Sequence, residues 1–159
     1  IVGWYLSIVD VLLIMLDIIL LVLFGTTLST IICYPLKTQG QMSAVGTIIS
    51  SGYGFICGAY MPISQFGNVL QNILSFFPST YATSLIRNHT MRGIISEMKK
   101  IGFPNEAIIN IENSVDYNTY FFGNLVKVWQ MYLILGGFII IMIIFFVVLN
   151  KIKLKNKNN

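Results

Sequence analysis

Residues 128–149 read VWQMYLILGGFIIIMIIFFVVL, and this stretch decides the fold of the chain. It carries no charged residue and reaches the length of roughly 20 apolar residues that a helix needs to cross a bilayer. A backbone in lipid must satisfy its own hydrogen bonds, so the segment is either a helix or a strand of a closed barrel. Barrel strands alternate polar and apolar residues, and this stretch does not. We therefore expect a transmembrane helix over residues 124–149.

Two further apolar stretches precede this one along the chain. Residues 11–34 read VLLIMLDIILLVLFGTTLSTIICY and contain a single charge, Asp17. Residues 42–61 read MSAVGTIISSGYGFICGAYM, which carries no charge but is diluted by glycine and serine. Charged residues make up only 10% of the chain, against about 25% in soluble domains. The sequence therefore predicts an all-α, multi-pass transmembrane protein with three spans.

The charges beside the spans predict the orientation, because lysine-rich flanks stay on the cytoplasmic side. The turn at residues 35–41 carries Lys37, whereas residues 62–127 are close to neutral, so we expect the turn inside and the long segment outside. The tail at residues 150–159 carries basic side chains and no acid: Lys151, Lys153, Lys155 and Lys157. We expect a cell-membrane protein with a cytoplasmic C-terminus, whose net charge of +4 serves orientation and contact with membrane lipids, not nucleic-acid binding.

The long outer segment is predicted to begin with a helical hairpin over residues 62–93. Pro62 breaks the preceding helix after Met61 because proline cannot donate an amide hydrogen bond. Residues 64–77 place apolar side chains at spacings of three and four, which predicts a helix too short to cross the membrane.

A second short helix completes the hairpin. Pro78 interrupts the first helix, and Ser79 or Thr80 can cap the second, which is expected to close near Gly93. We expect a shallow re-entrant pair in the outer leaflet, where neighbouring protein or water satisfies the broken backbone.

The remaining outer segments are a cap and a lead-in. Two short amphipathic stretches, IISEMKKI and NEAIINIENS, are separated by Gly102 and Pro104, and we expect a small helical cap over residues 94–123. Residues 1–10 are expected to lie at the outer interface. Because Ile1 stands inside an apolar stretch, the chain is expected to be a piece of a longer protein.

Two short motifs occur in a specific order: GAYMPIS closes the second predicted span, and FFPSTYATSLIRNHTMRG follows an amphipathic stretch. In this order the chain resembles the C-terminal half of the type-2 permeases of ATP-binding-cassette exporters, over roughly residues 11–149. That family has a small-Gly-aromatic-x-Pro motif at the end of its fifth span and a Pro-x-Thr-Tyr-Ala motif after the first external helix. The matching residues are Gly58, Ala59, Tyr60, Met61 and Pro62 for the first motif, Pro78, Thr80, Tyr81 and Ala82 for the second, and Arg87 at the usual basic position.

The resemblance implies a function. A dimer of such permeases forms the path through which drugs, lipids, peptides or polysaccharides leave the cell, and a partner ATPase hydrolyses the ATP. The permease itself has no catalytic site and no cofactor. The family usually has six spans and a coupling helix between the second and third, so a chain with the last three spans is not expected to couple ATP hydrolysis by itself.

Two other functions remain open from the sequence. One is a non-transporting membrane protein, such as an assembly or immunity factor, whose hairpin and cap bind an external partner. The other is a truncated, inactive permease.

Asp17 is the candidate polar site within the membrane. A charge at the centre of a span costs about 3 kcal/mol, so we expect Asp17 to face protein or water and to have a functional role by default. The alternative is that it lies near the outer interface together with Asp10, which is on the same helical face.

Small residues recur every four positions in the second predicted span. Such a stripe lets another helix approach closely, as packing within one subunit, as a lining of the route or as a dimer seam. The residues of this stripe are Gly46, Ser50, Gly54 and Gly58.

Other side chains have plainer interpretations. Arg87, His89 and Arg92 form a basic cluster that either binds headgroups or an anionic substrate, or extends its charges to the interface. An aromatic belt is predicted near the outer boundaries. Its members are Trp4, Tyr5, Tyr60, Tyr120 and Trp129.

No catalytic motif is recognisable in the sequence. The chain has one histidine, and Cys33 and Cys57 lie in different predicted spans, where they are expected to be packing residues rather than a disulfide or metal site. We therefore expect no enzyme, no metal and no nucleic-acid partner.

Overall fold

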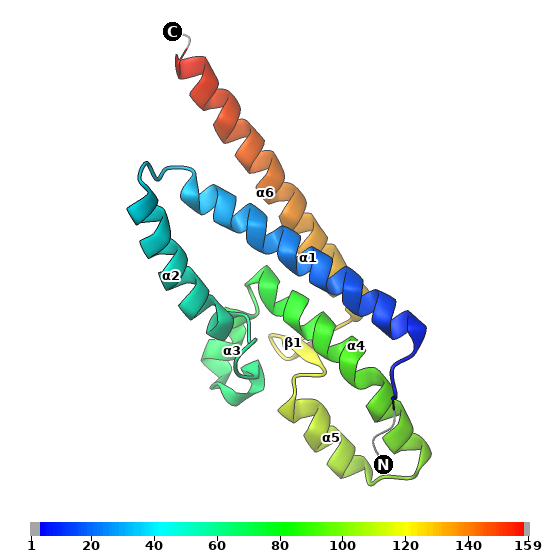
Figure 1. Ribbon diagram of the computed structural model, residues 1–159. Coiled ribbons are helices and arrows are strands. Elements are labelled where there is room, and N and C mark those ends of the chain that lie inside the picture. Colours follow the sequence, from blue (N-terminus) through cyan, green and yellow to red (C-terminus); the bar gives the residue numbers. More distant parts are fainter. Residues whose placement is uncertain (1–3, 158–159) are drawn as a thin grey trace.

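A computed structural model describes residues 4–157 of the chain, and in this part the protein is predominantly helical (Figure 1). Three long helices form a bundle, a fourth stands beside it, and the short helices and the β-hairpin lie toward one end of the molecule. The elements are α1 (Ile8–Cys33), α2 (Gln39–Ile56), the 3₁₀ turn η1 (Ile63–Gln65), α3 (Asn68–Leu74), α4 (Pro78–Lys100), α5 (Asn105–Ser114), β1 (Thr119–Phe121), β2 (Asn124–Val126) and α6 (Val128–Lys157).

Helices α1 and α6 are long and apolar enough to cross a membrane, which confirms the first and the last predicted spans as helices of that kind. Only 17% of the most apolar window of α1 and 11% of that of α6 is buried. A core helix of a water-soluble protein would instead be mostly covered, so these exposed apolar faces indicate association with a membrane.

The ends of these two helices differ from the predicted bounds. Helix α1 begins earlier, at Ile8, because Ser7 and Asp10 form a reciprocal capping box at its first turn. Helix α6 begins at Val128, later than residue 124, since the preceding residues belong to β2, and it continues through Lys157. The basic tail is therefore helical as far as Lys157, and its residues 158–159 lie outside the described part, as do residues 1–3 of the lead-in.

Helix α2 is shorter than the predicted span over residues 42–61. It starts with a capping box between Thr38 and Gln41 and ends at Ile56. Its end is set by Gly58, which has a φ of 74°, a left-handed conformation that favours glycine after a helix. The prediction that this helix reaches Met61 was wrong, and α2 is not among the helices apolar enough to qualify as a span.

The predicted hairpin helices also have different bounds. Residues 64–77 do not form one helix, because Gly67 adopts an extended conformation and separates η1 from α3. Helix α4 is longer than predicted and passes through Gly93 without closing there. The backbone of Tyr5 lies against Gly93, so the glycine provides space for a close contact in place of a helix end.

The start of α4 has a simple physical reason. Phe77 is its N-cap residue and Pro78 occupies the first turn, where the missing amide hydrogen is not needed. The prediction that Ser79 or Thr80 caps this helix was wrong. The Thr80 hydroxyl instead donates to the carbonyl of Leu74 at 2.9 Å, which closes the turn between α3 and α4. We call this turn, residues 74–80, the elbow.

The cap contains the predicted helix α5 and an unpredicted β-hairpin. The stretch NEAIINIENS forms α5, whereas IISEMKKI is the end of α4. Strands β1 and β2 are antiparallel and joined at Phe122 and Gly123, which both have positive φ, as in the two-residue turns that match strand twist. The fold is therefore not all-α in the described residues, although the two-stranded sheet is small.

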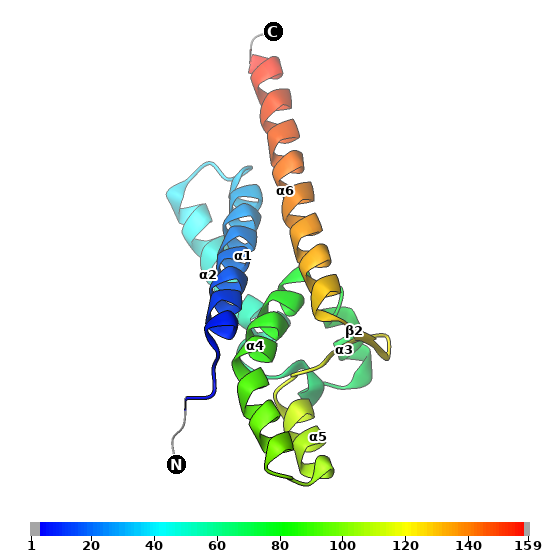
Figure 2. The ribbon, with the colours of Figure 1, turned by 90° about the vertical axis from the view of Figure 1, so that its right-hand side faces the viewer.

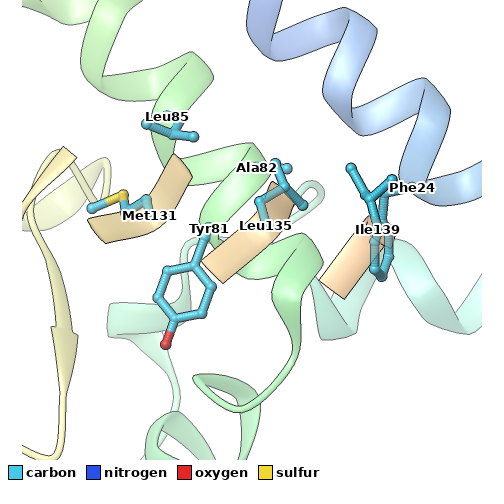
Figure 3. Packing of buried hydrophobic residues seen from close by; sticks show 7 residues of the cluster. All are labelled: Phe24, Tyr81, Ala82, Leu85, Met131, Leu135 and Ile139. Atoms are coloured by element: carbon cyan, nitrogen blue, oxygen red, sulfur yellow. The ribbon is translucent and has the colours of Figure 1, made fainter. Parts of the chain in front are cut away.

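The apolar core lies where α4 packs between α1 and α6 (Figure 3). Helix α4 runs antiparallel to α1: Pro78 at its start shares a groove with Phe24 of α1, and Arg92 in its second half pairs with Asp10 in the first turn of α1 (Figure 2). The buried cluster comprises Phe24 of α1, Tyr81, Ala82 and Leu85 of α4, and Met131, Leu135 and Ile139 of α6.

Candidate functional site

The most distinctive polar site lies between α1, α4 and α6, next to the apolar core. Asp17 of α1 is fully buried. Its Oδ2 atom is 2.6 Å from Nδ1 of His89 on α4, and its Oδ1 atom accepts a hydrogen bond of 2.5 Å from the Tyr132 hydroxyl on α6. Both carboxylate oxygens are thus paired, each with a different helix.

The two partner rings support each other. His89 is only 2% exposed, and its ring stacks on that of Tyr132 with 6.3 Å between centroids and 24° between planes. A buried carboxylate without partners would cost several kcal/mol, so the pairing is a condition for α1, α4 and α6 to meet at this level. Asp17 therefore faces protein, as expected, while its functional role stays a prediction.

A second polar contact lies one step toward the start of α1. Asp10 is buried, and its carboxylate accepts a 2.7 Å hydrogen bond from the Ser7 hydroxyl and lies 3.5 Å from Arg92 on α4. Arg92 has a half-exposed side chain, so this ion pair contributes little by itself. It marks the level at which the second half of α4 meets the start of α1.

A third group of polar contacts joins the end of α2 and the middle of α4 to the segment after α5. Arg87 of α4 lies 3.1 Å from the carboxylate of Asp116 and also donates to the carbonyl of Gly58. The same carboxylate accepts hydrogen bonds from the backbone amides of Ile63 and Ser64. Through these bonds the end of α2, the turn η1, the helix α4 and the segment after α5 are held at one point.

The residues of the first family-like motif lie between α2 and η1, those of the second lie at the elbow between α3 and α4, and both sets have structural contacts. Gly58 ends α2, and Pro62 precedes η1. The ring of Tyr60 packs edge to face on Phe55. The Tyr81 hydroxyl donates a 2.6 Å hydrogen bond to the carbonyl of Ser75. Together with the contacts of Pro78, Thr80 and Arg87, these interactions stabilise the turn from α2 through α3 into α4.

The small-residue stripe has no helix packed along it in the described part of the chain. Gly46 has open space beside it, and Ser50 is exposed. Gly54 is covered by the Tyr60 ring, and Gly58 lies beyond the end of α2. The predicted packing partner of this stripe therefore stays a prediction.

The structure separates the predicted basic cluster. His89 is buried against Asp17, so the prediction that it faces headgroups beside Arg87 and Arg92 was wrong. Each of the three side chains has its own acidic partner. A sequence pattern that considers one helix at a time cannot show this, because the partners come from other elements.

Chemically, the cluster of Asp17, His89 and Tyr132 can hold three helices together, since each oxygen of one carboxyl group is bonded to a side chain from a different helix. Among the described residues no group of three or more His, Cys, Asp or Glu side chains is placed to hold a metal ion. Neither Cys33 nor Cys57 forms a disulfide.

A comparison of the chain with known protein families, curated proteins and solved structures finds no match. The fold and the polar contacts between its helices therefore have to support any functional conclusion.

Proposed function

We propose that the chain is the C-terminal half of the membrane subunit of an ATP-driven exporter that moves a drug, lipid, peptide or polysaccharide out of the cell. In this proposal α1, α2 and α6 cross the cell membrane and the lysine-rich end of α6 lies in the cytoplasm. The elbow between α3 and α4 enters the outer leaflet. A second permease, a separate ATPase and membrane lipids are its partners.

The observation that carries this proposal is the depth of the elbow. Phe77 and Pro78, at its tip, line one apolar groove with Phe24 of α1 and Phe138 of α6. From this tip α4 runs back along α1 to the level of Asp10. The distance from Phe24 to Asp10 along α1 is about 21 Å at 1.5 Å per residue. If α1 and α6 span the bilayer, the elbow reaches its middle.

A re-entrant elbow needs protein or water beside its broken backbone. Here the free carbonyls of the elbow have protein donors: Leu74 accepts from Thr80, and Ser75 accepts from Tyr81. The carbonyl of Cys57 at the end of α2 accepts a 2.5 Å bond from Thr83 of α4. This arrangement supports the view that the elbow lies within the membrane and not on its surface.

The proposal makes α2 the second of three membrane spans along the chain. Helix α2 has 18 residues, which extend about 27 Å at 1.5 Å per residue, close to the roughly 30 Å of a hydrocarbon core. It follows α1 after a short turn and runs in the opposite direction (Figure 1). Its glycines and serines lower its apolarity, but they suit a helix covered by neighbouring helices of a larger complex.

In this proposal the partner ATPase binds at the cytoplasmic end of the helices. The α1–α2 turn lies toward the same end as the C-terminal part of α6 (Figure 1). There the Tyr34 hydroxyl donates to the carbonyl of Leu149 at 3.1 Å, and Lys153 lies over the Tyr34 ring at 4.7 Å. These contacts tie the end of α1 to α6 and support a fixed cytoplasmic end.

Labelling with a membrane-impermeant maleimide on intact cells tests the topology. In a background with Cys33→Ser and Cys57→Ala, a single cysteine at Ser114 in α5 should react, and one at Leu154 in α6 should react only after the cells are opened. Both positions are exposed in the protein, so a lack of reaction reports the membrane side. Reaction of the Leu154 position in intact cells would overturn the orientation.

The transport role needs a second measurement. The tagged chain should co-purify with an ATPase after mild crosslinking in its native cells, and its loss should stop export by the complex. Correct topology without any ATPase partner would favour a membrane protein that binds an external partner through its cap.

A further inference from the structure

The apolar groove at the tip of the elbow has a volume of about 410 Å³. Its lining consists of side chains from residues 24–31 of α1, residues 138–145 of α6, Tyr53 of α2, and Phe77 and Pro78 of the elbow. Tyr53 is the only one of these side chains with an oxygen or nitrogen atom, and its hydroxyl oxygen is buried. The groove therefore offers apolar contacts alone, and an apolar chain or ring fits it.

The groove continues the line of α4 along the same two helices. Helices α1 and α6 run side by side and parallel (Figure 2). Asp17 is bonded to Tyr132 toward one end of this pair, and the Tyr34 hydroxyl is bonded to the carbonyl of Leu149 at the other. Helix α4 packs against both helices as far as Pro78, and beyond Pro78 the groove takes its place.

The length of the groove corresponds to one leaflet of a membrane. From Phe24 to Tyr34 helix α1 extends about 15 Å at 1.5 Å per residue, which is half of a hydrocarbon core of roughly 30 Å. A partner helix that crosses the whole membrane along the groove would collide with the elbow at Phe77 and Pro78. An acyl chain ends near the middle of the bilayer, so the elbow leaves room for it.

The other end of the groove leads to a cationic part of the molecule. Lys153 of α6 lies there, over the Tyr34 ring at 4.7 Å. No Asp or Glu occurs in α1 after Asp17, in α2 or in α6, so an anionic group beside Lys153 meets no like charge from these helices. From Lys153 to Phe138 helix α6 extends about 22 Å, which is half of the roughly 40–45 Å of a bilayer with its headgroups. One phospholipid therefore reaches from Lys153 to the elbow.

We propose that this groove holds one acyl chain of an anionic phospholipid of the cytoplasmic leaflet, with its phosphate beside Lys153. The site rests on the part of the proposed function that places α1 and α6 across the membrane with Lys153 in the cytoplasm. It needs neither export nor an ATPase. The lipid completes the bundle, because in one half of the membrane it occupies the place that α4 occupies in the other half.

Native mass spectrometry of the full chain tests this site. The chain is purified in a mild detergent and mixed with phosphatidylglycerol and phosphatidylcholine that carry the same acyl chains. One phosphatidylglycerol per chain should stay bound, with a preference over phosphatidylcholine of about five-fold, the effect of one lysine near an anionic lipid. Retention of neither lipid, or equal retention of both, would overturn the proposal.

Two neighbouring residues of α6 give a matched pair of variants for the groove. Ile141 lines the groove and is 61% exposed, whereas Ile140 is 60% exposed and is not part of the lining. Ile141→Trp should lower the retained lipid about ten-fold, because the indole takes up the space in which the acyl chain makes its contacts. Ile140→Trp should retain lipid as the unaltered chain does. Both side chains are exposed, so both variants should fold, which circular dichroism checks.

A second pair of variants examines the headgroup. Lys153→Gln should remove most of the preference for phosphatidylglycerol. Lys151→Gln should keep it, because Lys151 lies about 200° around α6 from Lys153, at about 100° per residue. Equal effects of the two changes would show a general attraction to the basic end of α6 and would overturn the placement of the phosphate.

Two further results would overturn the lipid site. Equal loss of lipid in Ile141→Trp and Ile140→Trp would show that lipid covers α6 without a defined site. A lipid-free dimer that only Ile141→Trp dissociates would assign the groove to a second copy of the chain. Maleimide labelling reports the orientation separately, so failure of the lipid site is distinguishable from failure of the proposed function.

Discussion

Helices α1 and α6 differ from α4 in a way that shows how this chain is built. The first two are apolar and mostly uncovered, and the buried residues of α1 are Asp10, Asp17 and Phe24, two of them acids. Helix α4 has a more polar sequence, yet it is the most enclosed: its buried residues include a run from Pro78 to Leu85 rich in Ser and Thr. The usual order of a water-soluble protein, apolar inside and polar outside, is partly reversed.

The difference has a physical reason. A lipid contact satisfies an apolar side chain, so if α1 and α6 cross a membrane as proposed, they lose little by leaving their Ile, Leu and Phe side chains outside. Lipid offers no partner for a hydroxyl or a carboxylate, and these groups have to find each other inside the protein. Stability should therefore depend on buried positions of α4 and on polar contacts between helices, whereas outward apolar positions should tolerate apolar replacement.

The largest expected effect is at Leu85, which is fully buried between α1 and α6. Leu85→Ala should lower the free energy of unfolding by about 4 kcal/mol, because the packing contacts of the removed atoms are lost and a cavity remains. Denaturant unfolding in detergent micelles measures it. Leu133→Ala on the exposed face of α6 is the matched control, with an expected loss below about 0.5 kcal/mol. Equal losses at the two positions would show that stability depends no more on buried positions of α4 than on outward positions of α6.

A charge on the outward face of α6 should have the next largest effect. Ile140 is 60% exposed, and Ile140→Lys should raise the cost of membrane insertion by about 3 kcal/mol. A glycosylation-based insertion assay reads the inserted fraction, and Ile140→Val serves as control. Full insertion and stability of the lysine variant would show that this face is not in lipid.

Asp17 should have an intermediate effect. Asp17→Ala removes two interhelical hydrogen bonds, and contacts of this kind in membranes contribute about 0.6 kcal/mol on average and about 1.7 at most, so we expect a loss of about 2 kcal/mol. Tyr132→Phe removes one of the two bonds but leaves a buried oxygen of Asp17 without its donor, so it should cost about as much as Asp17→Ala. If the phenylalanine variant were as stable as the unaltered chain, the bond between Tyr132 and Asp17 would not hold α6 against α1.

The smallest effect is expected at Gly58, where the backbone has a φ of 74°. Gly58→Ala should cost about 1 kcal/mol through strain in the left-handed region, and the new methyl group would also press on the Ile63 side chain. Gly46→Ala is the control, since Gly46 is helical with open space beside it, and this change should be neutral or slightly stabilising. A neutral Gly58 variant would show that the left-handed glycine does not set the end of α2.

Local sequence features predicted several elements correctly. The apolar runs of α1 and α6, the amphipathic helix α5 and the interruption at Pro78 all follow from a few adjacent residues. Other features escaped prediction because their local signals were weak. The turn between β1 and β2 places Phe122, not Asn or Gly, in a left-handed conformation, and Gly93 resembled a helix end although it is a contact site.

The sequence by itself determined that this chain has two long apolar helices and a break at Pro78 between them, since length, apolarity and a missing amide hydrogen are properties of contiguous residues. Only the tertiary structure decided where the elbow lies and which polar groups meet. Asp17, His89 and Tyr132 are far apart along the chain and come together because α4 packs between α1 and α6. A carboxylate buried among helices needs a donor, but its own position in the sequence does not specify which distant side chain provides it.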